Sequence, residues 1–147
     1  MKINVAWIGK TKEPAIRALT EEYLRRISRY AEVAGLALKD EAAILSLARG
    51  ERQNKERYKL VLLDSRGKQL SSEEFAEFIE REQLSAVPLL FAIGGSDGFS
   101  EEARLRAGAA LSLGKMTLPH ELARVVLVEQ IYRAFTILKN HPYHLGH

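Results

Sequence analysis

The sequence predicts an α/β domain in which helices cover both faces of a mostly parallel sheet. Short, continuously apolar runs alternate along the chain with segments of helical periodicity. Most of these runs end at glycine or at other turn residues, as strands do. No internal repeat, low-complexity tract or linker interrupts the 147 residues, so we expect one domain spanning residues 1–147.

The composition narrows the possible classes of protein. Hydrophobic residues make up 46% of the chain, which is too many for a disordered segment. The chain has no cysteine, which excludes disulfides and thiolate chemistry and suits a cytoplasmic protein. No apolar run reaches the roughly 18 residues of a membrane span, so no membrane partner is expected. The net charge of +3 permits a nucleic-acid partner without requiring one.

The first third of the chain predicts two strands and two helices. Residues 3–8 are β-prone and end at Gly9, which predicts a strand. Apolar residues then recur at helical spacing over 16–30, and the other side of this helix carries several arginines, with Lys10 and Lys12 just before it. Such a side fits a solvated face and a phosphate-binding face about equally well. Residues 33–38 predict a weaker strand, and the charged segment 40–57 is expected to be helical and to fray at residues 50–54.

The middle of the chain carries a buried strand and a well-marked helix start. Residues 58–63 predict a buried strand, because residues 60–63 are all apolar. The segment Asp-Ser-Arg-Gly at 64–67 predicts a turn after this strand. Ser71 followed by Glu74 matches a capping box, so a helix is expected to begin there.

Another strand, turn and helix follow. Residues 88–93 predict a fully buried strand, which ends at the glycine-rich segment 94–98. Ser100 precedes two glutamates, an arrangement typical of a helix cap with an acidic first turn. Residues 109–113 predict a last short strand.

The final helix, expected from Glu121 to about Lys139, is more apolar than one buried face requires. Pro119 suits its first turn, where a missing N–H costs nothing. The expected polar arc consists of Glu121, Arg124, Glu129, Arg133, Thr136 and Lys139. One side of the helix can pack on its own sheet, and a second copy of the chain is the simplest neighbour for the other side.

Three strand ends are the expected place for a ligand, because open α/β sheets bind ligands beyond the carboxyl ends of their strands. They are residues 63–67, 94–98 and 114–118. Glycine in the last two lets a backbone approach a ligand closely, although glycine after a strand is also common in plain turns. The dinucleotide fingerprint, the P-loop and the nucleophile elbow are all absent. A ligand would therefore be held mainly by backbone groups and by shape.

Two patterns of charged residues near the end of the chain allow more than one reading. His141, His144 and His147 are spaced three apart, but without cysteine or a scaffold to fix tetrahedral geometry no metal site is predicted. Glu129 and Arg133 are four apart, in the order that favours a helical ion pair. Such a pair is as compatible with a structural role as with a place in a cleft.

Four segments carry a resemblance to a known family. They are Phe91–Gly95, Met116-Thr117-Leu118-Pro119-His120 with the residues up to Arg124, Val128–Ala134, and His141-Pro142-Tyr143-His144. In order and spacing these segments resemble the RlmH family of small SPOUT-class methyltransferases. Each motif alone is weak, but together they are highly specific. The resemblance spans nearly the whole chain and is strongest from Tyr58 onward.

The resemblance implies an enzyme that uses S-adenosylmethionine to methylate the N3 atom of a pseudouridine in 23S ribosomal RNA of the large subunit. It also implies a homodimer and a C-terminal trefoil knot, which no pattern in composition or periodicity could reveal. Carried over by position, the cofactor-binding residues are Leu63, Gly94, Leu113, Gly114, Lys115, Met116, Thr117 and Leu118.

The resemblance also suggests catalytic residues near the chain end. Tyr143 and His144 are the candidates for substrate contact or proton removal, and Arg133, positioned by Glu129, could orient the base or its phosphate. Two alternatives stay open. A related SPOUT enzyme could methylate another RNA position, such as a ribose hydroxyl, and a non-catalytic dimer could bind RNA without transferring methyl.

Overall fold

A computed structural model describes residues 1–52 and 55–145, without the side chain of His144. Within these residues the strands are β1 (Lys2–Ile8), β2 (Glu32–Leu38), β3 (Lys59–Gln69), β4 (Leu89–Ile93) and β5 (Ala109–Ser112). The helices are α1 (Pro14–Ile27), α2 (Glu41–Ala48), α3 (Ser72–Gln83), α4 (Glu101–Arg106) and α5 (His120–Leu138), followed by a short 3-10 turn, η1 (Pro142–His144). The strands form one sheet in the order β2-β1-β4-β3-β5.

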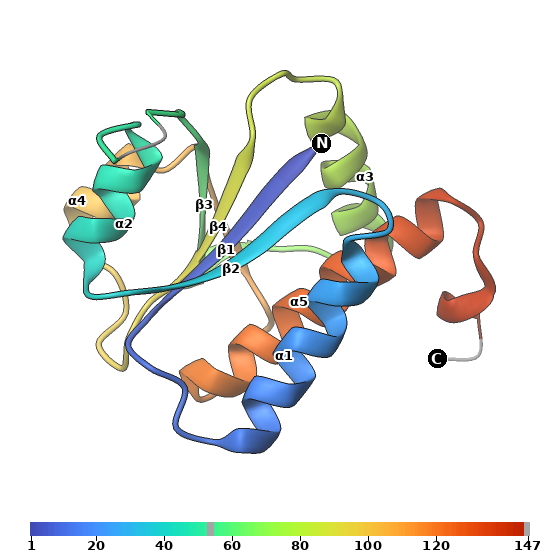
Figure 1. The fold of residues 1–147 in the computed structure, drawn as a ribbon, viewed down its shortest axis with the longest axis horizontal. Coiled ribbons are helices and arrows are strands. Elements are labelled where there is room, and N and C mark those ends of the chain that lie inside the picture. The colour runs from blue at the N-terminus through green and yellow to red at the C-terminus, as the bar shows by residue number, and fades with distance from the viewer. Residues whose placement is uncertain (53–54, 146–147) are drawn as a thin grey trace.

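The predicted fold class is confirmed. Every neighbouring pair of strands in the sheet is parallel. Helices α1, α3 and α5 lie on one side of the sheet, and α2 and α4 lie on the other (Figure 1). The strands run toward the lower side of that view, where the first turns of α1 and α5 also lie.

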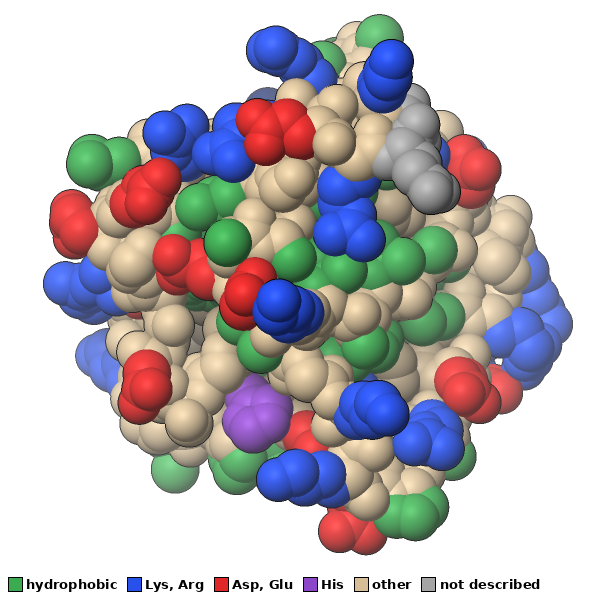
Figure 2. Space-filling model, turned by 60° about the vertical axis from the view of Figure 1, so that its left-hand side comes forward, with side chains coloured by type: hydrophobic (Ala, Val, Ile, Leu, Met, Phe, Trp, Pro, Cys, Tyr) green, Lys and Arg blue, Asp and Glu red, His purple; other side chains and the backbone are tan. Residues whose placement is uncertain are grey.

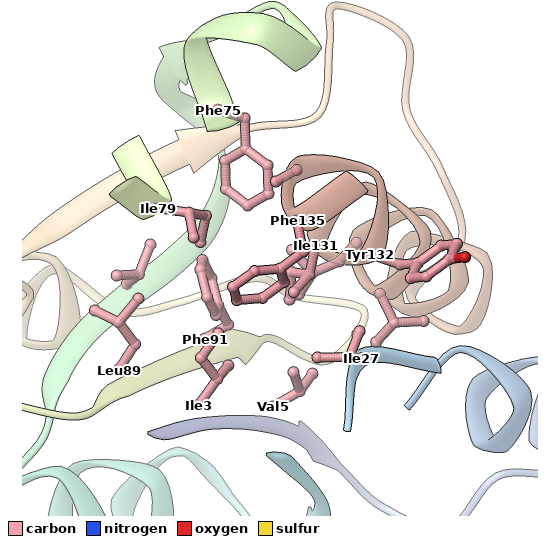
Figure 3. Close-up of a cluster of buried hydrophobic side chains, with 14 of the residues drawn as sticks. Ile3, Val5, Ile27, Phe75, Ile79, Leu89, Phe91, Ile131, Tyr132 and Phe135 are labelled. Atoms are coloured by element: carbon pink, nitrogen blue, oxygen red, sulfur yellow. The ribbon is translucent and has the colours of Figure 1, made fainter. Parts of the chain in front are cut away.

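One core fills the space between the sheet and the helices α1, α3 and α5. Figure 3 shows Phe91 of β4 facing Ile131 and Phe135 of α5, with Phe75 of α3 above them. The ring centroids of Phe75 and Phe91 are 6.0 Å apart in an edge-to-face arrangement. Alternate residues of the same strands form a second core with α2 and α4, as strand periodicity requires.

Local capping signals were predicted correctly. The Ser71 hydroxyl accepts a hydrogen bond from the Glu74 backbone, and the Glu74 carboxylate accepts one from the Ser71 backbone. This is the predicted capping box of α3. Ser100 caps α4 in the same way. Pro119 is the N-cap residue of α5 and not part of its first turn, so that detail was wrong.

The turn predicted after the third strand is wrong. β3 continues through residues 64–67 to Gln69, and its register against β5 shifts between Leu63 and Lys68. Gly67 makes this possible, because a Cβ atom there would lie 2.6 Å from the backbone of Ala110. The Asp64 carboxylate, almost buried, accepts a hydrogen bond of 2.6 Å from Arg104 of α4. These long-range contacts override the local turn signal.

The second copy invoked to cover α5 is not needed for most of that helix. α5 packs between α1 and α3 of its own chain, which cover two of its sides. Its expected polar arc is also partly wrong, because Arg124 and Thr136 are buried. Leu122 is 47% exposed near the start of the helix, so the apolar surface of α5 that remains exposed to solvent is smaller than expected.

Two further properties bear on function. No helix in the described part of the chain is long and apolar enough to cross a membrane. Among the side chains that the structure describes, no three could hold a metal ion together, and those of His144 and His147 lie outside this set. The trefoil knot stays a prediction from the family resemblance.

Candidate active site

Three of the strands bring the predicted cofactor-binding segments to one edge of the sheet. Leu63 of β3 pairs with Ile93 of β4 on one side and with Leu111 of β5 on the other. Gly94 directly follows β4, and Leu113 directly follows β5. Gly94 and the segment from Leu113 onward therefore lie at neighbouring strand ends, as the sequence predicted, whereas Leu63 lies level with them inside β3, which continues to Gln69.

The turn after β4 is tight at Gly94. A Cβ atom on Gly94 would lie 3.2 Å from the carbonyl carbon of Gly98 and 3.3 Å from the ring of Phe99. The Gly98 backbone donates a hydrogen bond of 3.0 Å to the Gly95 carbonyl, and Gly98 has a φ of 73°. By contrast, a Cβ atom on Gly95 would meet nothing within 4 Å. The turn thus combines a closely packed base with open space at Gly95.

The segment between β5 and α5 is exposed. Met116 is 87% exposed, and Leu113, Lys115, Thr117 and Leu118 are also exposed. Ser112 fixes the start of the segment, because its hydroxyl donates to the Gly114 carbonyl and accepts from the Gly114 N–H. Gly114 has a φ of 137°, a conformation that favours glycine, and open space beside it.

The start of α5 is attached to the loop between β1 and α1, a contact that the sequence analysis missed. The Glu121 carboxylate accepts hydrogen bonds from the backbones of Lys12 and Glu13, at 3.2 and 3.4 Å. These bonds lower the pKa of Glu121. Arg124 donates a hydrogen bond of 2.5 Å to the Thr11 hydroxyl. No local signal pairs these residues, which are more than 100 positions apart in the chain.

Arg124 is 2% exposed, which is unusual for a charged side chain that forms no ion pair with any described residue. Its guanidinium lies 4.0 Å from the ring centre of Trp7, a cation–π contact. Burial lowers its pKa, and nearby Glu121 partly opposes that effect. The Nε atom of Arg124 and the Nε1 atom of Trp7 have no hydrogen-bond partner among the described residues.

Three of the four predicted catalytic residues, Glu129, Arg133 and Tyr143, form a separate cluster near the chain end, the tail cluster. The Glu129 carboxylate accepts a hydrogen bond of 2.6 Å from Arg133 and one of 2.8 Å from the Tyr143 hydroxyl. The Tyr143 ring packs edge-on against Tyr132, with centroids 4.7 Å apart, and its hydroxyl lies 3.4 Å from that of Tyr23. The backbone of His144 belongs to η1, and its side chain lies outside the described part of the structure.

This cluster changes the ionisation of its members. Burial raises the pKa of Tyr143 well above its ordinary value, and the hydrogen bonds with Tyr23 and Glu129 raise it further. The hydrogen bond with Glu129 raises the pKa of Arg133. At neutral pH Tyr143 therefore keeps its proton and Arg133 its charge. Tyr143 suits the role of a hydrogen-bond donor that fixes the tail better than that of a base.

We expect Tyr143 to ionise late in an alkaline titration. Above about pH 10 the unfolded chain loses the Tyr143 proton while the folded chain keeps it. The unfolded state then binds fewer protons, so stability should fall as pH rises from about 10 toward the raised pKa. Tyrosinate absorbance measured for the wild type and for Tyr143→Phe gives the difference curve. A difference curve centred near pH 10 would contradict the raised pKa.

The two groups of predicted site residues are not joined within one chain. No hydrogen bond or ion pair among residues 1–52 and 55–145 connects the segment 113–118 with Glu129, Arg133 or Tyr143. Glu129 lies nine positions after His120 on α5, a rise of about 14 Å. A hollow of about 710 Å³ at the opposite, amino edge of the sheet is lined by none of the predicted residues.

Comparison with known proteins identifies the class. Residues 1–144 match the family described as "Predicted SPOUT methyltransferase". A probable methylase family protein from Haemophilus influenzae Rd KW20 has a similar structure, with a TM-score of 0.58 at 13% identity over 98% of this chain and 69% of that one. The SpoU methyltransferase AviRb from Streptomyces viridochromogenes, solved in complex with AdoMet, gives 0.52 at 14% identity over 90% and 57%. The family match over residues 1–144 makes the chain a methyltransferase of the SPOUT class, and the two solved structures share its fold.

Closer relatives share one name, "Ribosomal RNA large subunit methyltransferase H". The protein from Koribacter versatilis is 55% identical over 148 residues, covering 100% of both chains. The protein from Trichlorobacter lovleyi is 48% identical over 98% of this chain and 99% of its own, and that from Carboxydothermus hydrogenoformans is 44% identical over the same shares. The chain belongs to the ribosomal RNA large subunit methyltransferase H family, as the sequence motifs had indicated.

Proposed function

We propose that this chain transfers a methyl group from S-adenosylmethionine to the N3 atom of a pseudouridine in 23S ribosomal RNA of the large subunit, as a cytoplasmic homodimer. The observation that carries the proposal is the 55% identity to a ribosomal RNA large subunit methyltransferase H over the full length of both chains. The AdoMet complex of AviRb, which has the same fold, supports the choice of cofactor.

The strand-end edge fits a ligand held by backbone groups. No backbone–backbone hydrogen bond involves residues 115–118 within the described chain, so their N–H and C=O groups are available. Open space next to Gly95 and Gly114 gives a ligand access to this backbone. These features support Leu63, Gly94 and residues 113–118 as the cofactor site. When bound there, S-adenosylmethionine supplies a methyl group carried on a positively charged sulfur.

In this proposal the tail cluster and the adjacent His144 supply the protein groups that methyl transfer requires. A bond forms between N3 and the methyl carbon, the bond from that carbon to sulfur breaks, and the N3 proton passes to a base. We assign the base to His144. Arg133 stabilises negative charge that develops on the imide or binds a neighbouring phosphate. Glu129 holds Arg133 and Tyr143 in place through its two short hydrogen bonds.

Two observations support a homodimer. The cofactor edge and the tail cluster lie apart in one chain, so the tail of a second copy is the natural complement to the cofactor edge. Several large apolar side chains just before α5, at its start and on α1 are also exposed, as expected of an interface. They are Leu19 (44%), Met116 (87%), Leu118 (37%) and Leu122 (47%). A solution mass of one subunit at working concentration would contradict this assembly.

Replacing His144 with alanine should lower the single-turnover rate of methyl transfer by about 10²–10⁴-fold, the usual contribution of a general base. Cofactor affinity, measured by calorimetry, should stay unchanged. His147→Ala removes a histidine three residues further along and serves as the matched control. An unchanged single-turnover rate for His144→Ala would exclude His144 as the base.

The reaction itself is tested by transfer of a tritiated methyl group to ribosomes that lack the modification. Nucleoside analysis of the product then locates the label. Label on N3 of a pseudouridine supports the proposed reaction, whereas label on a ribose hydroxyl would assign the chain to another SPOUT specificity. Binding to ribosomes without any transfer would indicate a non-catalytic protein.

A further inference from the structure

The loop of residues 10–13, between β1 and α1, lies beside the proposed cofactor edge. Trp7 of β1 pairs with Ile93 of β4, so the residues that follow each of them leave the sheet next to one another. On its other side the loop contacts Glu121 and Arg124, at the start of α5. The loop therefore sits between the Gly94 turn and the helix that continues from the segment 113–118.

We propose that Lys10 and Lys12 bind backbone phosphates of the RNA substrate at the rim of the methyl-transfer site, and that Glu121 and Arg124 hold them there. This inference rests on the proposed function, because it assumes an RNA substrate at this edge. It narrows the basic surface at the start of the chain to two lysines, which are not among the predicted site residues.

The backbone of the loop is firmly held although the loop is on the surface. The Glu121 carboxylate accepts hydrogen bonds from the backbone N–H groups of Lys12 and Glu13, and Arg124 donates one to the Thr11 hydroxyl. Arg17 of α1 donates a further hydrogen bond of 3.3 Å to the Thr11 carbonyl. Together these bonds fix the backbone from both helices. A loop fixed in this way loses little further backbone freedom when it binds a ligand.

Both lysines of the loop are available to a phosphate. Lys10 and Lys12 are exposed, and neither forms an ion pair with any residue that the structure describes. The nearest carboxylate along α5, that of Glu121, is already occupied by the two backbone N–H groups. An ammonium with no acidic partner can bind phosphate without first breaking an ion pair.

The arginines of α1, the other basic surface near the start of the chain, are less available. Glu22 binds Arg25 and Arg26, each at 2.7 Å, and Arg17 is bonded to the loop itself. Figure 2 shows a similar mixture on the face that includes α2 and α4, where acidic side chains lie among the basic ones around a central apolar area. The loop lysines are therefore the better candidates for phosphate contacts near the cofactor edge.

The buried guanidinium of Arg124 fits this arrangement. A charged side chain is costly to bury without an acidic partner, and an apolar residue could fill the same space. Arg124 makes its contacts with Trp7, at the end of β1, and with Thr11, within the loop. The first contact attaches α5 to β1 and the second attaches it to the loop, so Arg124 acts as a positioning residue for Lys10 and Lys12.

The test compares two double variants that each remove two positive charges. Lys10→Gln with Lys12→Gln should weaken binding of ribosomal RNA fragments about tenfold at low salt, and should reduce the slope of log affinity against log salt by about 2. Arg29→Gln with Lys139→Gln removes the same charge from exposed residues outside the loop and should leave the slope nearly unchanged. Equal effects of the two double variants would overturn the proposal.

A third variant separates positioning from general destabilisation. Thr11→Val removes the hydroxyl that Arg124 binds, and it should raise the KM for RNA with little change in kcat. Added to the lysine double variant, it should cause little further loss, because both changes act through one contact. Fully additive losses would show that Thr11 acts independently of Lys10 and Lys12, and that the loop is not held in order to position them. If the wild type transfers no methyl at all, the proposed function fails, whereas wild-type activity with unaltered lysine variants contradicts only this inference.

Discussion

Replacing Gly94 with valine is expected to weaken S-adenosylmethionine binding at least about 100-fold, a loss of about 3 kcal/mol. The Cβ atom alone would lie 3.2 Å from the carbonyl carbon of Gly98, and the two methyl groups of valine need more room still. The Gly95–Gly98 turn must shift to accommodate them. Because the turn is proposed to shape the cofactor site, its displacement should affect binding directly. Isothermal titration calorimetry measures the effect.

A matched control keeps this experiment specific. Ser96→Val places the same side chain at an exposed position of the same turn, where it should alter cofactor affinity little. Denaturant unfolding without cofactor then shows whether Gly94→Val still folds. A folded Gly94→Val protein with normal affinity would mean that the cofactor is not bound at the end of β4.

Replacing Glu129 with alanine should cost about 2–3 kcal/mol of folding free energy, somewhat below the value for a fully buried pair. The side chains of Glu129 and Arg133 are only 18% and 15% exposed, so removing the carboxylate leaves a mostly buried cation unpaired. The Tyr143 hydroxyl loses its acceptor at the same time. Urea unfolding measures the loss, and methyl transfer should fall further than stability because the tail is no longer held.

The chain offers a matched control for this prediction too. Glu22 also binds two arginines, Arg25 and Arg26, but on the exposed surface of α1. Surface pairs contribute little because water and salt screen them, so Glu22→Ala should be far milder. Similar losses at the two positions would show that the tail cluster is no better protected from water than the surface of α1.

Local signals predicted the elements of the fold well. The capping box of Ser71 and Glu74 and the cap at Ser100 depend on neighbours three residues away, so the sequence contains all the needed information. The same holds for the apolar strands and for the glycines that end β1 and β4. The methyltransferase class could also be inferred from the sequence, because the family motifs are short segments whose order and spacing are specific.

The same local reasoning failed where distant segments decide. Residues 64–67 have the composition of a turn, yet they continue β3 because Gly67 packs on Ala110 and Asp64 binds Arg104. Arg124 falls on the polar arc of its helix, yet it is buried because the loop after β1 covers it. In both cases the decisive partner is about 40 or more residues away in the chain.

The sequence by itself determined the alternation of strands and helices, their caps and the class of protein, because these depend on local patterns and on short motifs. Only the tertiary structure decided which side chains meet. It joined Tyr23 to Tyr143 across 120 residues and Thr11 to Arg124 across 113. The physical reason is that the order of the strands in the sheet sets which distant segments become neighbours, and local periodicity does not encode that order.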